Sequence, residues 1–321
     1  MSARTTLRWA RWRPAWRPRR PSGRTLLIIA LSAGLALSGR GASAIALETQ
    51  PAAGAGRVDS PAQAAARETA AVQAQASRLT VQYRNDPQAL EHSAQASLSA
   101  GRNDATVAVF LRLRWAGWLD AALEHYGAML PATDLPQLAL AAAGIQRYGA
   151  ALHHALLHDG PSRLIVVSVQ GQHLIAYERG RVVVDTPVTT GRPALPTDIG
   201  AMQVLHKDSP WTMRSPWPKG SPEWYPDTAV QMVIWFTSNG EGMHDASWQP
   251  VSSLGPGSQN GPFASHGCIH LPLAAVTTLF DWATIGTPVV VYPGDGSPVA
   301  SQILQQSVDA MGNPISGMRG D

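Results

Sequence analysis

The sequence predicts a mainly β domain preceded by a small all-helical region. Residues 61–158 are rich in Ala, Gln, Leu and Arg and contain almost no β-branched runs, which is typical of helices. From Pro161 onward, short Val- and Ile-rich segments alternate with turn signals such as Gln170-Gly171, which is typical of strands joined in hairpins. With 45% hydrophobic residues, the 321-residue chain is long enough for one large domain or two ordinary ones.

Residues 1–44 are predicted to be a signal for export from the cytoplasm. They hold nine arginines and no acidic residue, followed by the apolar run Thr25 to Gly39 and the small-residue site Ala42-Ser43-Ala44. An uncleaved anchor is the alternative, although the apolar run is shorter than the roughly 20 residues of a membrane span. Residues 45–60 are Ala-, Gly- and Pro-rich and are predicted to be a linker. Because the leader is predicted to direct export, the folded part is expected in a periplasm or cell wall.

The basic charge of the chain belongs to this leader. Without the nine leader arginines, the 25 basic residues fall to 16 against 22 acidic ones. The predicted folded part is therefore acidic, which argues against nucleic acid as a partner. Contact with a membrane is expected only through an uncleaved leader.

The expected elements follow the chain in order, with a helical region at 61–159, a catalytic domain at 160–293 and a flexible tail at 294–321. The sequence assigns no function to the helical region. The pair His154 and His158 lacks further ligands for a zinc site, and neither a metal nor a cofactor is expected. The expected helices are Pro61–Gln82, Pro87–Ala100, Asn103–Arg114, Gly117–Met129, Leu135–Leu157 and Pro272–Trp282. The expected strands are Leu164–Val169, His173–Tyr177, Arg181–Val188, Ala201–His206, Val230–Phe236, Glu241–His244 and Thr287–Tyr292. A long aromatic loop is expected from Lys207 to Asp227.

Cys268 is the only cysteine in the chain, and histidines lie close to it in the sequence. A thiol in an exported protein that has no disulfide partner is either a small buried residue or a nucleophile, and a nucleophile needs a base beside it. His266 is two residues away, about 6.5–7 Å along an extended chain, and is therefore a poor direct base. We favour His244, on a different strand, oriented by the carbonyl or carboxylate of Asp245. Gly267, without a side chain, lets backbone N–H groups face a developing oxyanion.

The segment Ser265-His266-Gly267-Cys268-Ile269 resembles the signature of L,D-transpeptidases with a YkuD-like catalytic domain. The likeness extends to Val188–Gly191, to Pro196–Gly200 and to Gly286–Val291, and covers about 130 of the 321 residues. It implies a β-sandwich-like fold with one or two helices. It also implies that Cys268 attacks a diaminopimelate carbonyl in a peptidoglycan stem peptide and that an amine of a neighbouring stem resolves the thioester as a 3→3 cross-link.

The same resemblance assigns roles to individual residues. Cys268 is the nucleophile, His244 the base and the Asp245 carbonyl its orienting group, while Gly267 supplies an oxyanion N–H and His266 supports the site. No cofactor is implied, and carbapenems are expected inhibitors. The residues expected to contact substrate are Ser265, His270, Trp248, Trp224 and Tyr225.

Three residues depart from the family pattern, namely Asp198, Asp245 and His270. His270 stands where Asn or Arg is usual, and imidazole can become charged near neutral pH where Asn cannot. Trimming of stem peptides as an L,D-carboxypeptidase and non-catalytic binding to the cell wall remain alternatives. A sortase is disfavoured because the next arginine after the cysteine is Arg319, and an NlpC-type peptidase because His270 is too close to Cys268.

Overall fold

The computed structural model describes residues 60–113, 116–132 and 134–294. The expected leader, nearly all of the expected linker and the tail beyond Gly294 lie outside these ranges. The chain divides into two compact units, Met1–Glu68 and Thr69–Asp321, and the site described below lies in the second. Within the described ranges, no helix combines the length and the apolar character that crossing a membrane requires.

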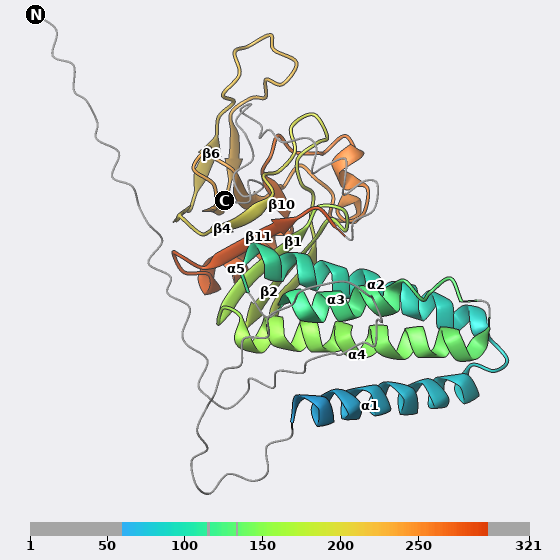
Figure 1. Cartoon of the computed structure of the whole chain (residues 1–321). Helices are drawn as coiled ribbons and strands as arrows, with labels where there is room; N and C mark the ends of the chain where they lie inside the picture. Colours follow the sequence, from blue (N-terminus) through green and yellow to red (C-terminus); the bar gives the residue numbers. More distant parts are fainter. Residues whose placement is uncertain (1–59, 114–115, 133, 295–321) are drawn as a thin grey trace, which may run out of the picture. The chain divides into compact units, whose positions relative to one another are not determined.

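The segment before the β domain is all-helical, as predicted. Its helices are α1 (Pro61–Gln82), α2 (Pro87–Phe110), α3 (Ala116–Gly127) and α4 (Leu135–Asp159). The side chains of Asp86 and Asp134 cap α2 and α4 by accepting backbone N–H groups of the first turn. Figure 1 shows α2, α3 and α4 running alongside one another.

The predicted break between residues 100 and 103 is wrong, because α2 continues through it. Gly101 lies where α2 meets α3 and α4. A Cβ atom there would come within 2.7 Å of Leu123 Cδ2 and 3.3 Å of the Gly149 Cα. Arg102 then pairs with Glu124 of α3 at 2.6 Å. Gly101 therefore allows α2 to approach α3 and α4 closely, and it does not end the helix.

The β domain consists of two sheets and a separate hairpin. The first sheet has the order β3-β2-β1-β11-β4, with β1 and β11 parallel, and the second has the order β10-β9-β8-β5. Strands β6 and β7 pair only with each other, and α5 (Leu273–Trp282) follows β10. The strands are β1 (Arg163–Ser168), β2 (His173–Glu178), β3 (Arg181–Pro187), β4 (Gly200–Gln203), β5 (His206–Asp208), β6 (Trp211–Met213), β7 (Thr228–Val230), β8 (Val233–Trp235), β9 (Gly242–Asp245), β10 (Ile269–Leu271) and β11 (Pro288–Tyr292).

Strands β1 and β11 of the five-stranded sheet are covered on both faces. Ile165 and Val167 of β1 point into a core shared with the second sheet and α5, whereas Leu164 and Val290 belong to the core of the helical region. A strand covered on both faces needs apolar residues at every position, which explains the continuous run Leu164–Val167. The mainly β domain with a sandwich-like core and a preceding helical region is confirmed.

The expected single strand Val230–Phe236 is two strands, β7 and β8. The carboxylate of Asp245 accepts the backbone N–H groups of Gln231 at 2.8 Å and Met232 at 3.0 Å, which interrupts the strand between them. Because β6 pairs with β7, the expected long loop is partly a hairpin, which we call the flap (residues 211–230).

We predict that two glycines of α4 respond oppositely to alanine. A Cβ at Gly144 would lie 2.1 Å from Tyr126 Cγ, whereas at Gly149 the nearest atom is 3.6 Å away. Gly144→Ala should lower the free energy of unfolding by about 1–3 kcal/mol through overpacking. Gly149→Ala should raise it by up to about 1 kcal/mol because alanine favours helix. Urea unfolding followed by far-UV circular dichroism measures both changes, and equal responses would contradict the packing described for α3 and α4.

Candidate active site

The cysteine and its expected base lie on one face of the second sheet. Strand β10 runs parallel to β9, and His270 stands directly opposite His244. Cys268 precedes His270 by two residues and so faces the same side of the sheet. The Gly242 N–H of β9 donates to the Cys268 Sγ at 3.4 Å. This register makes the thiol and the imidazole of His244 diagonal neighbours.

The neighbouring backbone carbonyl fixes the tautomer of His244. The Nδ1 of His244 lies 2.8 Å from the carbonyl oxygen of Asp245. A carbonyl oxygen only accepts, so Nδ1 carries the hydrogen and Nε2 of the neutral ring holds the lone pair. The carboxylate of Asp245 is occupied by backbone N–H groups of the β7–β8 connection. Burial lowers the pKa of His244, opposed by the hydrogen bond to Asp245, and the ring is therefore a neutral acceptor at neutral pH.

The surroundings of the Cys268 thiol favour its protonated form. Burial raises its pKa to about 12, the nearby carboxylate of Glu241 adds to the increase, and the Gly242 N–H opposes it. The two pKa shifts thus favour a neutral thiol beside a neutral imidazole, and not a preformed thiolate–imidazolium pair. The proton must therefore leave the sulfur as the sulfur attacks.

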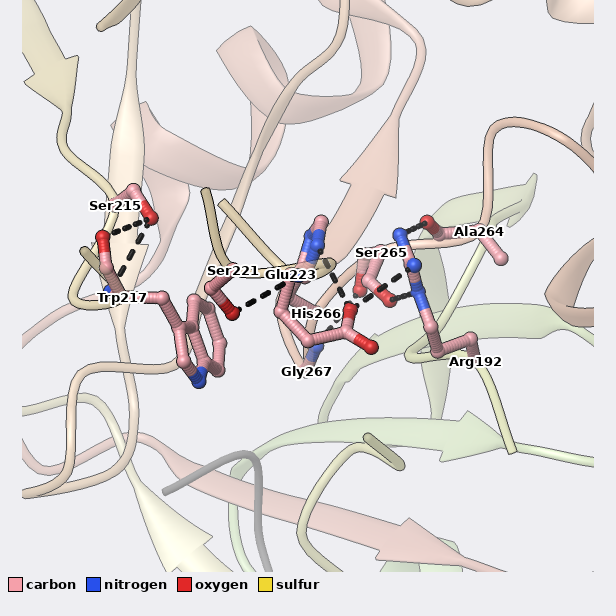
Figure 2. Close-up of polar contacts among 9 residues, drawn as sticks. All are labelled: Arg192, Ser215, Trp217, Ser221, Glu223, Ala264, Ser265, His266 and Gly267. Carbon is pink, nitrogen blue, oxygen red and sulfur yellow. Dashed lines mark hydrogen bonds and ion pairs between the residues drawn. The ribbon is translucent and has the colours of Figure 1, made fainter. Parts of the chain in front are cut away.

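The hydroxyl of Ser265 closes the segment that carries the cysteine, which we call the nucleophile loop (residues 264–268). It accepts the Gly267 N–H at 3.0 Å, as Figure 2 shows. It also donates to the Cys268 carbonyl oxygen. Gly267 has φ 124°, a conformation that favours glycine. The expected oxyanion donor, the Gly267 N–H, is thus already hydrogen-bonded in this structure. Ser265 is 3% exposed, and both functions of its hydroxyl are used inside the loop.

His270, the departure that the sequence left unexplained, is a buried member of a hydrogen-bonded network. Its Nδ1 lies 2.8 Å from Gln249 Oε1, and the amide nitrogen of Gln249 donates to Thr189 Oγ1 at 2.7 Å. Backbone hydrogen bonds also join Thr189 and His270 in both directions. Burial first, then the neighbouring rings of His244 and His266, lowers the pKa of His270 well below its usual value. This placement favours a role in holding β10 over the substrate contact that we expected.

A cavity of about 730 Å³ opens beside Cys268. Its volume is within the range of small-molecule sites. Tyr225, one of the expected substrate contacts, lines it, whereas Trp224 is not among the lining residues. Trp248 lies elsewhere, with its ring centroid 6.0 Å from that of His244 and 5.5 Å from that of His270. The aromatic residues that line the cavity are Trp211, Trp217, Tyr225, Trp235 and His266.

Arg192 connects the flap to the nucleophile loop through hydrogen bonds to both. Arg192 donates to the carbonyl oxygens of Ala264 at 3.2 Å and Ser265 at 3.3 Å, and to the carboxylate of Glu223 in the flap at 3.2 Å (Figure 2). The same Glu223 oxygen lies 3.5 Å from His266 Nε2. Sequence reasoning missed both charged residues, because their 31-residue separation gives no signal of pairing.

His266 lies against two aromatic rings of the flap. Its ring centroid is 5.4 Å from that of Trp217 and 5.1 Å from that of Tyr225. Burial and the positive charge of Arg192 lower the pKa of His266, while Glu223 raises it. His266 therefore forms part of the cavity wall beside Cys268, and its supporting role stays a prediction.

Comparisons with known proteins agree on the β domain. Residues 162–291 match the family model YkuD, the L,D-transpeptidase catalytic domain. Solved structures with similarity include an L,D-transpeptidase from Mycobacterium smegmatis (28% identity, TM-score 0.37), covering 41% of this chain and 59% of that one. A mutant L,D-transpeptidase of Enterococcus faecium is 30% identical over 41% of this chain and 50% of that one, also with a TM-score of 0.37. This chain thus spans about half to three fifths of these relatives. The comparison with curated proteins gives no match.

We predict that Glu223→Gln lowers the pKa of His266, because it removes the carboxylate that raises it. The loss of a partly buried ion pair should cost about 1 kcal/mol of stability or less. The pKa is measured by NMR titration of the imidazole. Glu178→Gln is the matched control, since Glu178 forms a comparable pair with Arg163 outside the site. A pKa of His266 that rises, or that moves equally in both variants, would contradict the assignment.

Proposed function

We propose that the domain at residues 162–291, which matches the L,D-transpeptidase catalytic domain, is a peptidoglycan L,D-transpeptidase with Cys268 as its nucleophile. The observation that carries the proposal is the register of β9 and β10, which sets Cys268 and His244 on one face. The Asp245 carbonyl leaves the Nε2 of His244 free to accept a proton. These three residues form a nucleophile, a base and an orienting group, the arrangement that thiol acyl transfer requires.

In the first half of the reaction, His244 Nε2 accepts the proton of the Cys268 thiol as the sulfur attacks the diaminopimelate carbonyl of a donor stem peptide. The carbonyl oxygen becomes an oxyanion, and the Asp245 carbonyl stabilises the imidazolium through the Nδ1–H. Collapse of the tetrahedral intermediate breaks the peptide bond. His244 returns the proton to the leaving amine, and terminal D-alanine departs.

In the second half, an amine of a neighbouring stem attacks the thioester. His244 accepts a proton from this amine and returns it to the Cys268 sulfur as the carbon–sulfur bond breaks. The product is a 3→3 cross-link. Water in place of the amine would give the trimmed stem of an L,D-carboxypeptidase, with the same residues in the same roles.

The surroundings of the thiol suit a peptide donor. The cavity beside Cys268 has a volume of about 730 Å³ and aromatic walls supplied largely by the flap. The substrate is part of the cell wall, so the protein is proposed to act outside the cytoplasm, in agreement with the leader predicted at residues 1–44. Carbapenems, which acylate nucleophiles through a strained carbonyl, are proposed as inhibitors of the same thiol.

The decisive experiment incubates the full chain with tetrapeptide stems and identifies the muropeptide products by mass spectrometry. We expect cross-linked dimers together with released D-alanine, and neither with Cys268→Ala. The same Cys268→Ala protein, with its thermal unfolding midpoint measured, shows whether the fold survives. Tripeptide stems without dimers would assign the chain to stem trimming, and unchanged stems with a folded wild-type protein would refute both reactions.

We also predict the pH dependence of Cys268 acylation by a carbapenem. Because the pKa of His244 is lowered, the rate should stay level as the pH falls to about 6.5, the ordinary histidine value, and should decline only below it. His244→Ala should slow acylation by about 10²–10⁴-fold, the usual contribution of a general base. His270→Ala should slow it less. A larger effect of His270→Ala in a folded protein would identify the wrong base.

A further inference from the structure

Thr197 is a fully buried residue that contacts the nucleophile loop from outside it. Its hydroxyl donates to the carbonyl oxygen of Gly267 at 2.6 Å and accepts the Gly191 N–H at 2.9 Å. The hydroxyl hydrogen is therefore committed to Gly267, since an amide N–H only donates. A Cβ at Gly191 would lie 2.2 Å from the carbonyl oxygen of Leu195, so the chain folds tightly back there and delivers Thr197 to the loop.

The Gly267 carbonyl belongs to the peptide group that also holds the Cys268 N–H. The Gly267–Cys268 bond is not among the cis bonds of the chain, and in a trans peptide group the C=O and N–H point in opposite directions. Fixing the carbonyl on Thr197 therefore fixes the N–H on the opposite side of the loop. This anchor matters because Gly267, at φ 124° and without a side chain, would otherwise let the peptide group rotate.

The other polar groups of this turn already have partners. The Gly267 N–H donates to Ser265 Oγ, and the Cys268 carbonyl accepts from the same hydroxyl. Among residues 60–113, 116–132 and 134–294, none accepts a hydrogen bond from the Cys268 N–H. An amide beside the sulfur, held in one orientation and available as a donor, is what an oxyanion requires.

We propose that Thr197 is a positioning residue that holds the Cys268 N–H in place as the oxyanion donor. The proposal rests on the proposed function, because it takes Cys268 as the nucleophile. Thr197 itself contacts neither the sulfur nor the substrate; it acts through the carbonyl of Gly267. Its contribution should appear only in reactions that build a negative charge on a carbonyl oxygen.

The test compares two reactions of the single cysteine of the full chain. Acylation by a carbapenem creates an oxyanion, whereas alkylation by iodoacetamide displaces iodide at a saturated carbon and creates none. Both are followed by intact-protein mass spectrometry. We expect Thr197→Val to slow acylation by about tenfold or more, short of the 10²–10³-fold cost of removing a donor outright, and to leave alkylation within about twofold.

Two variants separate positioning from damage to the fold. Thr190→Val is the matched control, because Thr190 is equally buried but its hydroxyl accepts from Gln172 and has no contact with Gly267. Thr197→Ser keeps the hydroxyl and should keep the wild-type ratio of the two rates, which also serves as the test if Thr197→Val does not fold. Thermal unfolding midpoints of all variants accompany the rates.

The outcomes are distinct. Equal slowing of both reactions in Thr197→Val, the same selective loss in Thr190→Val, or a changed ratio in Thr197→Ser would overturn the proposal. A wild-type protein that is alkylated but never acylated would instead count against Cys268 as an acyl-transfer nucleophile, and so against the proposed function itself.

Discussion

The parallel pairing of β10 with β9 is the constraint on which the site depends. It sets His270 opposite His244 and brings Cys268, two residues earlier, to the same face of the sheet. A shift of one residue in this register would turn the thiol to the opposite face. The surrounding contacts protect that register, since His270 is joined to the Thr189 backbone and to Gln249. The relative position of Cys268 and His244, the proposed nucleophile and base, is thus set by two short strands and their hydrogen bonds.

A second feature of the site is that the polar side chains around the cysteine mostly form hydrogen bonds to main-chain groups. Ser265, Thr197 and Arg192 all contact main-chain groups of the nucleophile loop, and the orienting partner of His244 is also a carbonyl. These contacts hold the backbone of the nucleophile loop around Cys268. Burial raises the pKa of the thiol and lowers that of His244, so both shifts favour the neutral forms of the two groups.

The sequence was sufficient to propose a nucleophile and a base, and less so to find the residues that support them. Cys268 and His244 could be proposed because few residue types are suited to thiol acyl transfer, and the change from Ala- and Gln-rich to Val-rich segments located the β domain. Thr197 and Arg192 could not be recognised as site residues, because each reaches the nucleophile loop from a segment distant in sequence. The same holds for Gln249, which contacts His270. The break expected between the helices Pro87–Ala100 and Asn103–Arg114 failed, because the polar residues that follow Gly101 lie within one continuous helix and the glycine itself admits neighbouring helices.

The five-stranded sheet links the helical region to the catalytic domain through Leu164 and Val290, which lie in the helical core. If the segment from Arg163 to Tyr292 were separated from α2, α3 and α4, it would expose that apolar sheet face to water. The catalytic half alone would therefore carry an exposed apolar patch of the kind that promotes association of protein molecules, and α2, α3 and α4 act as its cover in the whole chain.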